Sequence, residues 1–203
     1  MDVLEVGKAA VLAAFDDLDT TLGYFRALDN SRPAGVWELV PAARTVLVRF
    51  DPESIPHEKV VRWLRATQPN AAAGETSTAE VHIPVHYDGP DLDDVSEMTG
   101  LSIDEVISAH TGMPWTVAFS GFAPGFGYLA GGDARLHVPR RAEPRTAVPA
   151  GAVALASEFS GIYPRSSPGG WQLIGTTRTV IWDPVRSPPA LLRPGTTVRF
   201  EAV

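Results

Sequence analysis

The sequence predicts an α+β protein in two parts: a small ferredoxin-like α/β domain, followed by an antiparallel sheet that closes into a sandwich or barrel. In the first part, helical and strand-like patterns follow the order β-α-β-β-α-β. Residues 112–203 contain 23 of the 36 glycine and proline residues, which indicates short strands joined by frequent turns. The small, polar and aperiodic stretch Gln68–Thr78 is typical of a linker. We therefore expect one domain over residues 1–78 and a second over residues 79–203.

The elements of the first part are assigned from hydrophobic spacing. Apolar residues recur at helical intervals before and after two alternating runs, and the short connection between those runs predicts an antiparallel hairpin. Proline suits the first turn of a helix, so Pro56 is expected to open the second helix. In order, we expect a strand within Val3–Phe15, a helix over Asp17–Leu28, strands Val36–Val40 and Thr45–Phe50, a helix from Pro56, and a strand Val81–Val85.

Two short helices and several strands are expected in the second part. The first helix, Asp91–Met98, opens with acidic residues and stops before Gly100. The second begins at the capping box Ser102–Glu105 and shows one apolar face, formed by Ile103, Val106, Ile107 and His110. Short apolar runs then predict strands at Thr116–Phe119, Ala152–Ala156, Trp171–Ile174, Thr179–Trp182 and Thr197–Phe200.

Composition excludes several classes of protein. No apolar run approaches the roughly 20 residues that a membrane helix needs, and the N-terminus lacks the features of a signal peptide, so a cytoplasmic location is expected. Cysteine is absent, which excludes disulfides, thiol catalysis and zinc–thiolate sites. The net charge of −7 argues against non-specific binding to nucleic acid.

Charge is unevenly distributed along the chain. Residues 1–111 hold 8 Lys and Arg against 19 Asp and Glu, whereas residues 112–203 hold 9 Arg, no Lys and 5 Asp and Glu. Arginine forms bidentate pairs with carboxylates and phosphates. The arginines therefore either lie in solvent, pair with the acidic half, or bind a small anionic ligand. Arg140, Arg141 and Arg145, in a segment stiffened by prolines, are the candidates for such a site.

His110 is the candidate for proton transfer, as a general acid or base beside the glycine-rich loop that follows it. Its helical spacing also allows a hydrogen-bonded core histidine near the end of the helix. His82 and His86 share a face of one expected strand, but no third ligand accompanies them, so no metal site is expected.

The segment Gly121–Leu129 interleaves glycine, proline and aromatic residues. It lacks the Lys-Ser/Thr ending of a Walker loop, but glycine-rich amides can cradle an anion. The alternative is that its rings plug one end of a barrel. Turns further along are expected to bring more aromatic groups to the same mouth. The candidate substrate-binding residues are Phe122, Gly125, Phe126, Tyr128, Tyr163, Gly169, Gly170 and Trp171, together with the three arginines.

The ordered motifs His82–Tyr87, Gly121–Phe126, Pro139–Arg141, Gly161–Pro164 and Ser167–Gly175 together resemble those of the KipI-like family. This family comprises the B subunits of 5-oxoprolinase, also called allophanate hydrolase subunit 1, of the carboxyltransferase subdomain C and D type. The resemblance covers nearly all of residues 80–200 and is looser before them. It implies that the second domain is a cyclophilin-like β-barrel.

The resemblance also implies one component of a hydrolase that opens 5-oxoproline to glutamate and is inactive without its partner. ATP with Mg would serve the complex, and no cofactor would be bound covalently to this chain. The implied partners are the KipA-like C subunit (allophanate hydrolase subunit 2) and a LamB/YcsF-like A subunit. Two alternatives stay open: a component of an allophanate hydrolase or urea carboxylase, and an inhibitor of a histidine kinase.

Overall fold

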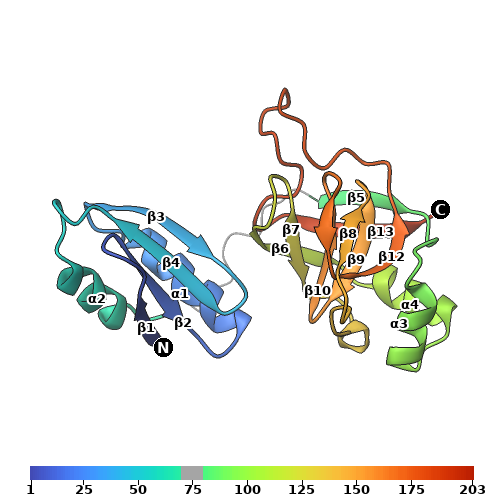
Figure 1. The fold of residues 1–203 in the computed structure, drawn as a ribbon, viewed down its shortest axis with the longest axis horizontal. Coiled ribbons are helices and arrows are strands. Elements are labelled where there is room, and N and C mark those ends of the chain that lie inside the picture. Colours follow the sequence, from blue (N-terminus) through green and yellow to red (C-terminus); the bar gives the residue numbers. More distant parts are fainter. Residues whose placement is uncertain (70–79) are drawn as a thin grey trace. The chain divides into compact units, whose positions relative to one another are not determined.

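The computed structural model describes residues 1–69 and 80–203, and the chain divides into two compact units, Met1–Glu75 and Thr76–Val203. The expected boundary after residue 78 lies outside the described residues, as does the predicted linker apart from Gln68 and Pro69. Helices and strands occur in both units (Figure 1), so the predicted α+β class is confirmed. Within the described residues, no helix is both long and apolar enough to cross a bilayer.

The first unit is a four-stranded antiparallel sheet with two helices on one face. Its strands lie in the order β1-β2-β4-β3. Inward-facing strand residues such as Val11 and Val48 pack against Leu28 of the first helix and Leu64 of the second. The elements are β1 (Asp2–Glu5), β2 (Ala10–Ala14), α1 (Leu18–Asn30), β3 (Val36–Pro41), β4 (Thr45–Phe50) and α2 (His57–Ala66).

One predicted strand forms two strands in the structure, and another predicted strand belongs to the sheet of the second unit. The apolar stretch Val3–Phe15 forms the hairpin β1–β2, with Leu4 opposite Leu12. The expected strand Val81–Val85 does not join this sheet, because it pairs with the last strand of the second unit. In its absence, β1 forms the edge of the sheet beside β2. Sequence periodicity identified the strands, but not the sheet to which each belongs.

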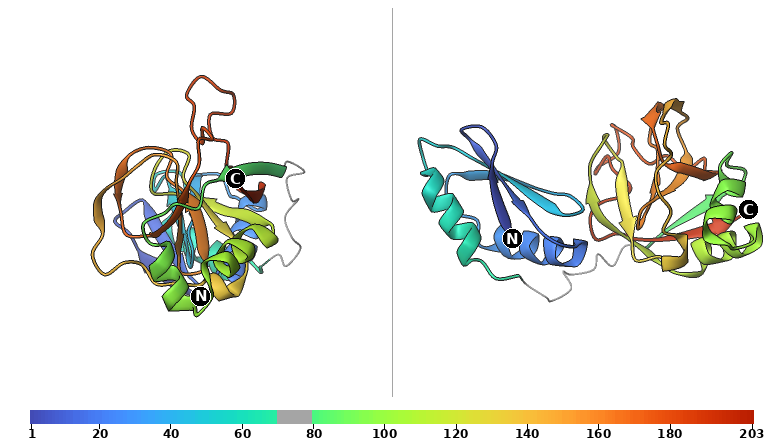
Figure 2. Two further views of the ribbon diagram at one scale, coloured as in Figure 1. Left: turned by 90° about the vertical axis from the view of Figure 1, so that its right-hand side faces the viewer. Right: turned by 60° about the horizontal axis from the view of Figure 1, so that its bottom comes forward.

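The second unit is a seven-stranded, nearly closed sheet in the order β12-β9-β10-β7-β6-β13-β5 (Figures 1 and 2). All neighbours in it are antiparallel except β13 and β5, which are parallel. His86 and Thr176 exchange backbone hydrogen bonds of 2.9 and 2.8 Å, and this bridge joins the two edges. Closure requires glycine at position 175, since a Cβ there would lie 2.5 Å from the His86 carbonyl oxygen.

Both helices and the strands β5, β6, β9, β12 and β13 lie where the sequence predicted them, whereas β7, β8, β10 and β11 were not predicted. The helices α3 (Leu92–Thr99) and α4 (Ile103–Gly112) contact each other and the strands β12 and β13, and the Ser102–Glu105 capping box forms. Ile103 is exposed, however, because the buried face of α4 consists of Val106, Ala109 and His110. The strands are β5 (Glu80–Val85), β6 (Trp115–Ser120), β7 (Gly127–Ala130), β8 (Arg145–Val148), β9 (Ala152–Ala156), β10 (Phe159–Ile162), β11 (Ser167–Gly169), β12 (Gln172–Thr176) and β13 (Thr197–Ala202).

The predicted strand Thr179–Trp182 does not form. This stretch belongs to an irregular segment between β12 and β13, in which only Trp182 makes an isolated bridge, to Ala190. The segment projects from the barrel in Figure 1 and in the left view of Figure 2. Arg186 holds it in shape by donating hydrogen bonds to the carbonyl oxygens of Val180, Ile181 and Pro189, at 2.9–3.2 Å.

Candidate functional site

The predicted aromatic residues meet on the outer face of the barrel wall. Leu129 of β7 and Ile162 of β10 point into the barrel core, so strand alternation directs Tyr128 and Gly161 outward. Phe126 is the centre of the outer cluster, with ring centroids 5.4 Å from both Tyr163 and Trp171. The rings pack edge to face and lie outside the wall, so they do not plug one end of the barrel.

Glycines make room for this packing. A Cβ at Gly161 would lie 2.9 Å from the Phe126 ring, and one at Gly169 would lie 2.2 Å from the Tyr163 hydroxyl. Gly170 has a different task, since its carbonyl accepts a 2.8 Å hydrogen bond from the Arg141 backbone N–H. The glycine-rich motif thus builds the aromatic cluster and anchors the arginine segment.

The Gly121–Leu129 loop exposes the Phe122 ring and leaves few of its amides unpaired. Phe122 has a positive φ of 65° and its side chain is 59% exposed, whereas Phe126 is buried. The N–H groups of Gly121, Ala123 and Phe126 donate to carbonyls within the loop. A run of amides able to cradle an anion, one of the expectations for this loop, is therefore not formed. Gly125 also has positive φ and packs against Trp182.

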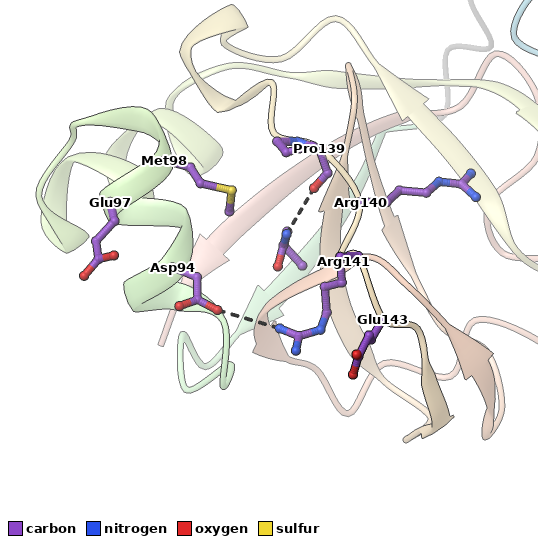
Figure 3. A pocket seen from close by; sticks show the side chains of 9 residues that line it. Asp94, Glu97, Met98, Pro139, Arg140, Arg141 and Glu143 are labelled. Carbon is purple, nitrogen blue, oxygen red and sulfur yellow. Dashed lines mark hydrogen bonds and ion pairs between the residues drawn. The ribbon is translucent and has the colours of Figure 1, made fainter.

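Arg140 is a cation at the edge of the aromatic cluster. Burial raises the pKa of Tyr128 and of Tyr163, and the Arg140 charge opposes that rise at both hydroxyls. Its side chain extends away from the carboxylates of Asp94 and Glu97 (Figure 3). Among the described residues Arg140 has no carboxylate partner. This guanidinium is therefore available to an external anion.

Arg141 and Arg145 are already paired. The carboxylate of Asp91 is 1% exposed and accepts from Arg141 Nη1 at 2.6 Å, from Arg145 Nη1 and Nη2 at 2.8 and 2.7 Å, and from the Leu173 backbone N–H at 2.7 Å. These hydrogen bonds with Asp91 raise the pKa of Arg145. The two arginines fix the segment before β8 against α3 and β12, and their expected role in binding a ligand carboxylate is met by Asp91.

A cavity of about 530 Å³ opens between α3, the Pro139–Glu143 segment and β12. Figure 3 shows Asp94, Glu97 and Met98 of α3 on one side and Arg141 with Glu143 on the other. Gln172 of β12 also lines it, is 4% exposed, and donates from Nε2 to the Pro139 carbonyl at 3.0 Å. The Gln172 Oε1 and Arg141 Nε atoms are buried and find no hydrogen-bond partner among residues 1–69 and 80–203.

His110 lies on the opposite side of the wall from the aromatic cluster. It is fully buried, stacks on Phe200 at 4.2 Å, and hydrogen-bonds the hydroxyls of Tyr87 (2.7 Å) and Ser160 (2.9 Å). Ser160 pairs in register with Leu129, so it faces the core. Burial lowers the pKa of His110 to about 3, so its imidazole is neutral at pH 7. The geometry favours the core-histidine alternative over proton transfer.

The structure thus brings the predicted residues together in two adjoining groups and separates one from them. The aromatic residues and Arg140 form an outer rim, Arg140 and Arg141 also line the cavity, and His110 lies apart in the core. The sequence prediction missed Asp91 and Gln172. In the sequence, Asp91 was noted only as one of several acidic residues at the start of a helix. Gln172 was noted only as part of the Ser167–Gly175 motif.

The sequence as a whole is similar to a known family and to named relatives. Residues 1–192 match the family model described as carboxyltransferase domain, subdomain C and D. The chain is 44% identical over 170 residues to the B subunit of 5-oxoprolinase from Escherichia coli O157:H7, which covers 81% of this chain and 77% of the relative. It is 40% identical over 180 residues to the protein of the same name from Bacillus subtilis strain 168, covering 82% and 75%.

A solved structure shares this architecture within a longer polypeptide. The crystal structure of TTHA0988 superposes with a TM-score of 0.77 at 36% sequence identity, and the match covers 96% of this chain. The chain spans 39% of the length of that solved protein. In TTHA0988, the matching part is therefore joined to a further stretch of polypeptide that is longer than the match itself.

Proposed function

The chain belongs to the carboxyltransferase domain family, subdomains C and D, and from this premise we propose that it is the B subunit of a 5-oxoprolinase. The enzyme would open the lactam of 5-oxoproline by adding water across the amide bond, which yields glutamate. Both relatives described above carry this name at 40–44% identity. On the geometric side, the observation that carries the proposal is Arg140, a guanidinium beside an open cavity, suited to the single carboxylate of this substrate.

The chain contributes binding and orientation to this reaction. Tyr128 and Tyr163 have raised pKa values and stay protonated at pH 7. The buried, neutral His110 has no route to a molecule on the outer face. The groups that activate water or phosphate are accordingly assigned to a companion polypeptide, and the isolated chain is expected to be inactive.

ATP with Mg is proposed to act at the level of the complex, away from this chain's cavity. Three carboxylates line that cavity and Arg141 is already paired with Asp91, so a triphosphate would be repelled there. Among residues 1–69 and 80–203, no group of three His, Asp or Glu side chains is placed to hold a metal ion. The lining of this cavity does not fit the nucleotide, and no step is assigned to it there.

The companion is proposed to be a C subunit of the KipA-like type. It would dock on an exposed apolar surface of the second unit that is formed by Phe122, Val180 and Val185. Phe122 and Val180 are each 59% exposed, and Val185 is 90% exposed. This apolar surface is ordered, because Arg186 fixes the segment that carries Val180 and Val185, and the Gly125–Trp182 contact links that segment to the loop that carries Phe122. Exposed aromatic and aliphatic groups on an ordered support are typical of interface centres.

Two measurements test the function. The purified complex of the chain with its companion, given ATP, should release glutamate from 5-oxoproline but leave urea and allophanate unchanged, while the chain alone should do neither. Arg140→Gln should raise KM by about tenfold with a smaller change in kcat, because it removes a contact made throughout the reaction. Arg193→Gln, at an exposed arginine of the same unit, is the matched control. Turnover of urea or allophanate in place of 5-oxoproline would reject the proposal.

The docking surface has its own test. Phe122→Ser should weaken association with the companion by about tenfold or more while leaving the fold intact. Trp37→Ser, which removes an equally exposed ring (59%) from the first unit, should leave affinity unchanged. Equal losses for the two variants in a titration would place the interface elsewhere.

A further inference from the structure

A second cavity, of about 400 Å³, opens in the second unit beside the end of β12. Its wall is formed by the turn that precedes β9, the two residues that follow β10, and residues 177–181. Its volume falls within the usual range of ligand pockets, about 300–1,000 Å³. The described residues that line it include no aspartate or glutamate, in contrast to the three carboxylates of the 530 Å³ cavity. The Asp88 carboxylate accepts from Thr176 Oγ1 at 2.9 Å, but neither residue is part of this lining.

Three arginines lie at or next to this cavity. Arg178 lines it and is exposed, and its guanidinium makes no hydrogen bond or ion pair with the part of the chain that the structure describes. Arg186 donates to the carbonyl oxygens of two lining residues, Val180 at 3.2 Å and Ile181 at 3.1 Å. Arg165 follows the lining residue Pro164 in the chain. Within residues 1–69 and 80–203, none of the three pairs with a carboxylate, so their combined charge attracts an anion.

Two threonines of the lining add a hydroxyl donor. The Oγ1 atoms of Thr177 and Thr179 are 3.1 Å apart, and Thr177 Oγ1 also accepts from the Thr179 backbone N–H at 3.2 Å. One hydroxyl donates to the other, so one of the two hydroxyl protons is left without an acceptor among the described residues, whichever direction that bond takes. Guanidinium and hydroxyl groups together are the donors with which proteins commonly bind phosphate oxygens.

Backbone hydrogen bonds hold the segments of the wall against one another. Gly151 donates to the Tyr163 carbonyl oxygen and accepts from the Thr177 N–H, each at 2.8 Å. Gly151 has a φ of 81°, and a Cβ at this position would lie 2.2 Å from the Thr177 carbonyl oxygen. Glycine therefore allows the turn before β9 to approach residue 177 this closely. The segments that carry the donors are in place before a ligand arrives.

We propose that this cavity binds a phosphate group. Arg178 would donate to two phosphate oxygens, and the free threonine hydroxyl would donate to a third. Pro164, Val180 and Ile181 give the same cavity an apolar side, which leaves room for a carbon body attached to the phosphate. The two cavities share no lining residue, so this site is separate from the one beside Arg140. The inference goes beyond the proposed function, which places no phosphate on this chain.

The test is calorimetric titration of the full chain with inorganic phosphate, ADP and acetate. Arg178→Gln should weaken phosphate binding by about tenfold or more, because it removes a charge-assisted contact. Arg193→Gln and Arg140→Gln, which remove exposed arginines of the same unit outside this cavity, should leave phosphate binding unchanged. Acetate should bind at least about tenfold more weakly than phosphate, since it carries one charge and offers only two oxygens.

The ADP titration distinguishes the sources of the phosphate group. Tighter binding of ADP than of inorganic phosphate would identify a phosphate ester as the ligand, and equal binding would identify the free ion; both results support the site if Arg178→Gln weakens them. No phosphate binding at millimolar concentration, equal losses for Arg178→Gln and Arg193→Gln, or acetate binding as tightly as phosphate would each overturn the inference. Thermal unfolding verifies that each variant is folded. Turnover of 5-oxoproline by the complex is measured separately, so the proposed function stands or fails on its own.

Discussion

Asp91→Asn provides the sharpest test of how the arginine segment is held. The substitution keeps the shape of the side chain but removes the charge that two guanidinium groups share, and it turns an amide N–H toward an arginine donor. Breaking a buried ion pair from one side costs about 3–5 kcal/mol. Arg141 and Arg145 keep 30% and 25% exposure, so the lower end, about 3 kcal/mol, applies here. For a unit of this size, that corresponds to a fall in Tm of about 10 °C.

The assay is calorimetry of the full chain combined with hydrogen exchange. The Leu173 amide, which donates to Asp91 Oδ2 at 2.7 Å, should lose protection first, while the strands of the first unit should be unaffected. The matched control is Asp94→Asn, since Asp94 is 61% exposed and lies 3.7 Å from Arg141. An exposed pair of this kind contributes at most about 1 kcal/mol. If both variants lose the same stability, Asp91 does not hold the segment as described.

Two further variants test the core histidine and the aromatic cluster. The unfolded chain protonates His110 near pH 6.5 but the folded chain only near pH 3, so wild-type stability should fall as pH drops below 6.5, by up to about 1.4 kcal/mol per pH unit from this group. His110→Gln should lack that contribution in urea titrations at pH 4–7 and should retain turnover; a folded variant that loses turnover about 100-fold would restore the proton-transfer role. Gly169→Ala, which forces a Cβ to 2.2 Å from the Tyr163 hydroxyl, should cost about 1–3 kcal/mol in thermal unfolding. Gly112→Ala, whose new Cβ would meet no described atom within 4 Å beyond its chain neighbours and its own helix backbone, should cost nothing, and equal losses for the two glycines would contradict the packing of the cluster.

Local patterns predicted local structure well. The capping box at Ser102 and Glu105 depends on groups three residues apart, and both of its hydrogen bonds form. Gly100 ends α3 in the left-handed conformation that glycine adopts without strain. The same reasoning could not assign β5 to its sheet, because an apolar strand suits either sheet until its neighbours are known. It also failed at Thr179–Trp182, where the short apolar run lacks the continuous partner strand that pairing requires.

The site was predicted in composition more than in arrangement. Aromatic rings, glycines and arginines were all singled out, and most of them gather around the outer wall and the cavity. The sequence did not predict that Arg141 and Arg145 pair with Asp91 whereas Arg140 does not, since Asp91 lies 50 residues from Arg141 and 54 residues from Arg145. Gln172 was missed because nothing in its neighbourhood along the chain indicates that its carbonyl oxygen is buried, or that it has no partner in the part of the chain that the structure describes.

The amino-acid sequence alone determined where helices begin and end, that glycine and aromatic residues would pack closely, and, through ordered motifs, the family. These properties depend on side chains a few residues apart or on order along the chain. Tertiary structure decided which side of a β-wall each group occupies: His110 inside and neutral, and Phe122 outside and exposed. It also decided that Asp91 holds two arginines, whereas Arg140 has no carboxylate partner within the described part of the chain. Burial and pairing arise from contacts between distant segments, and those contacts exist only once the barrel has closed.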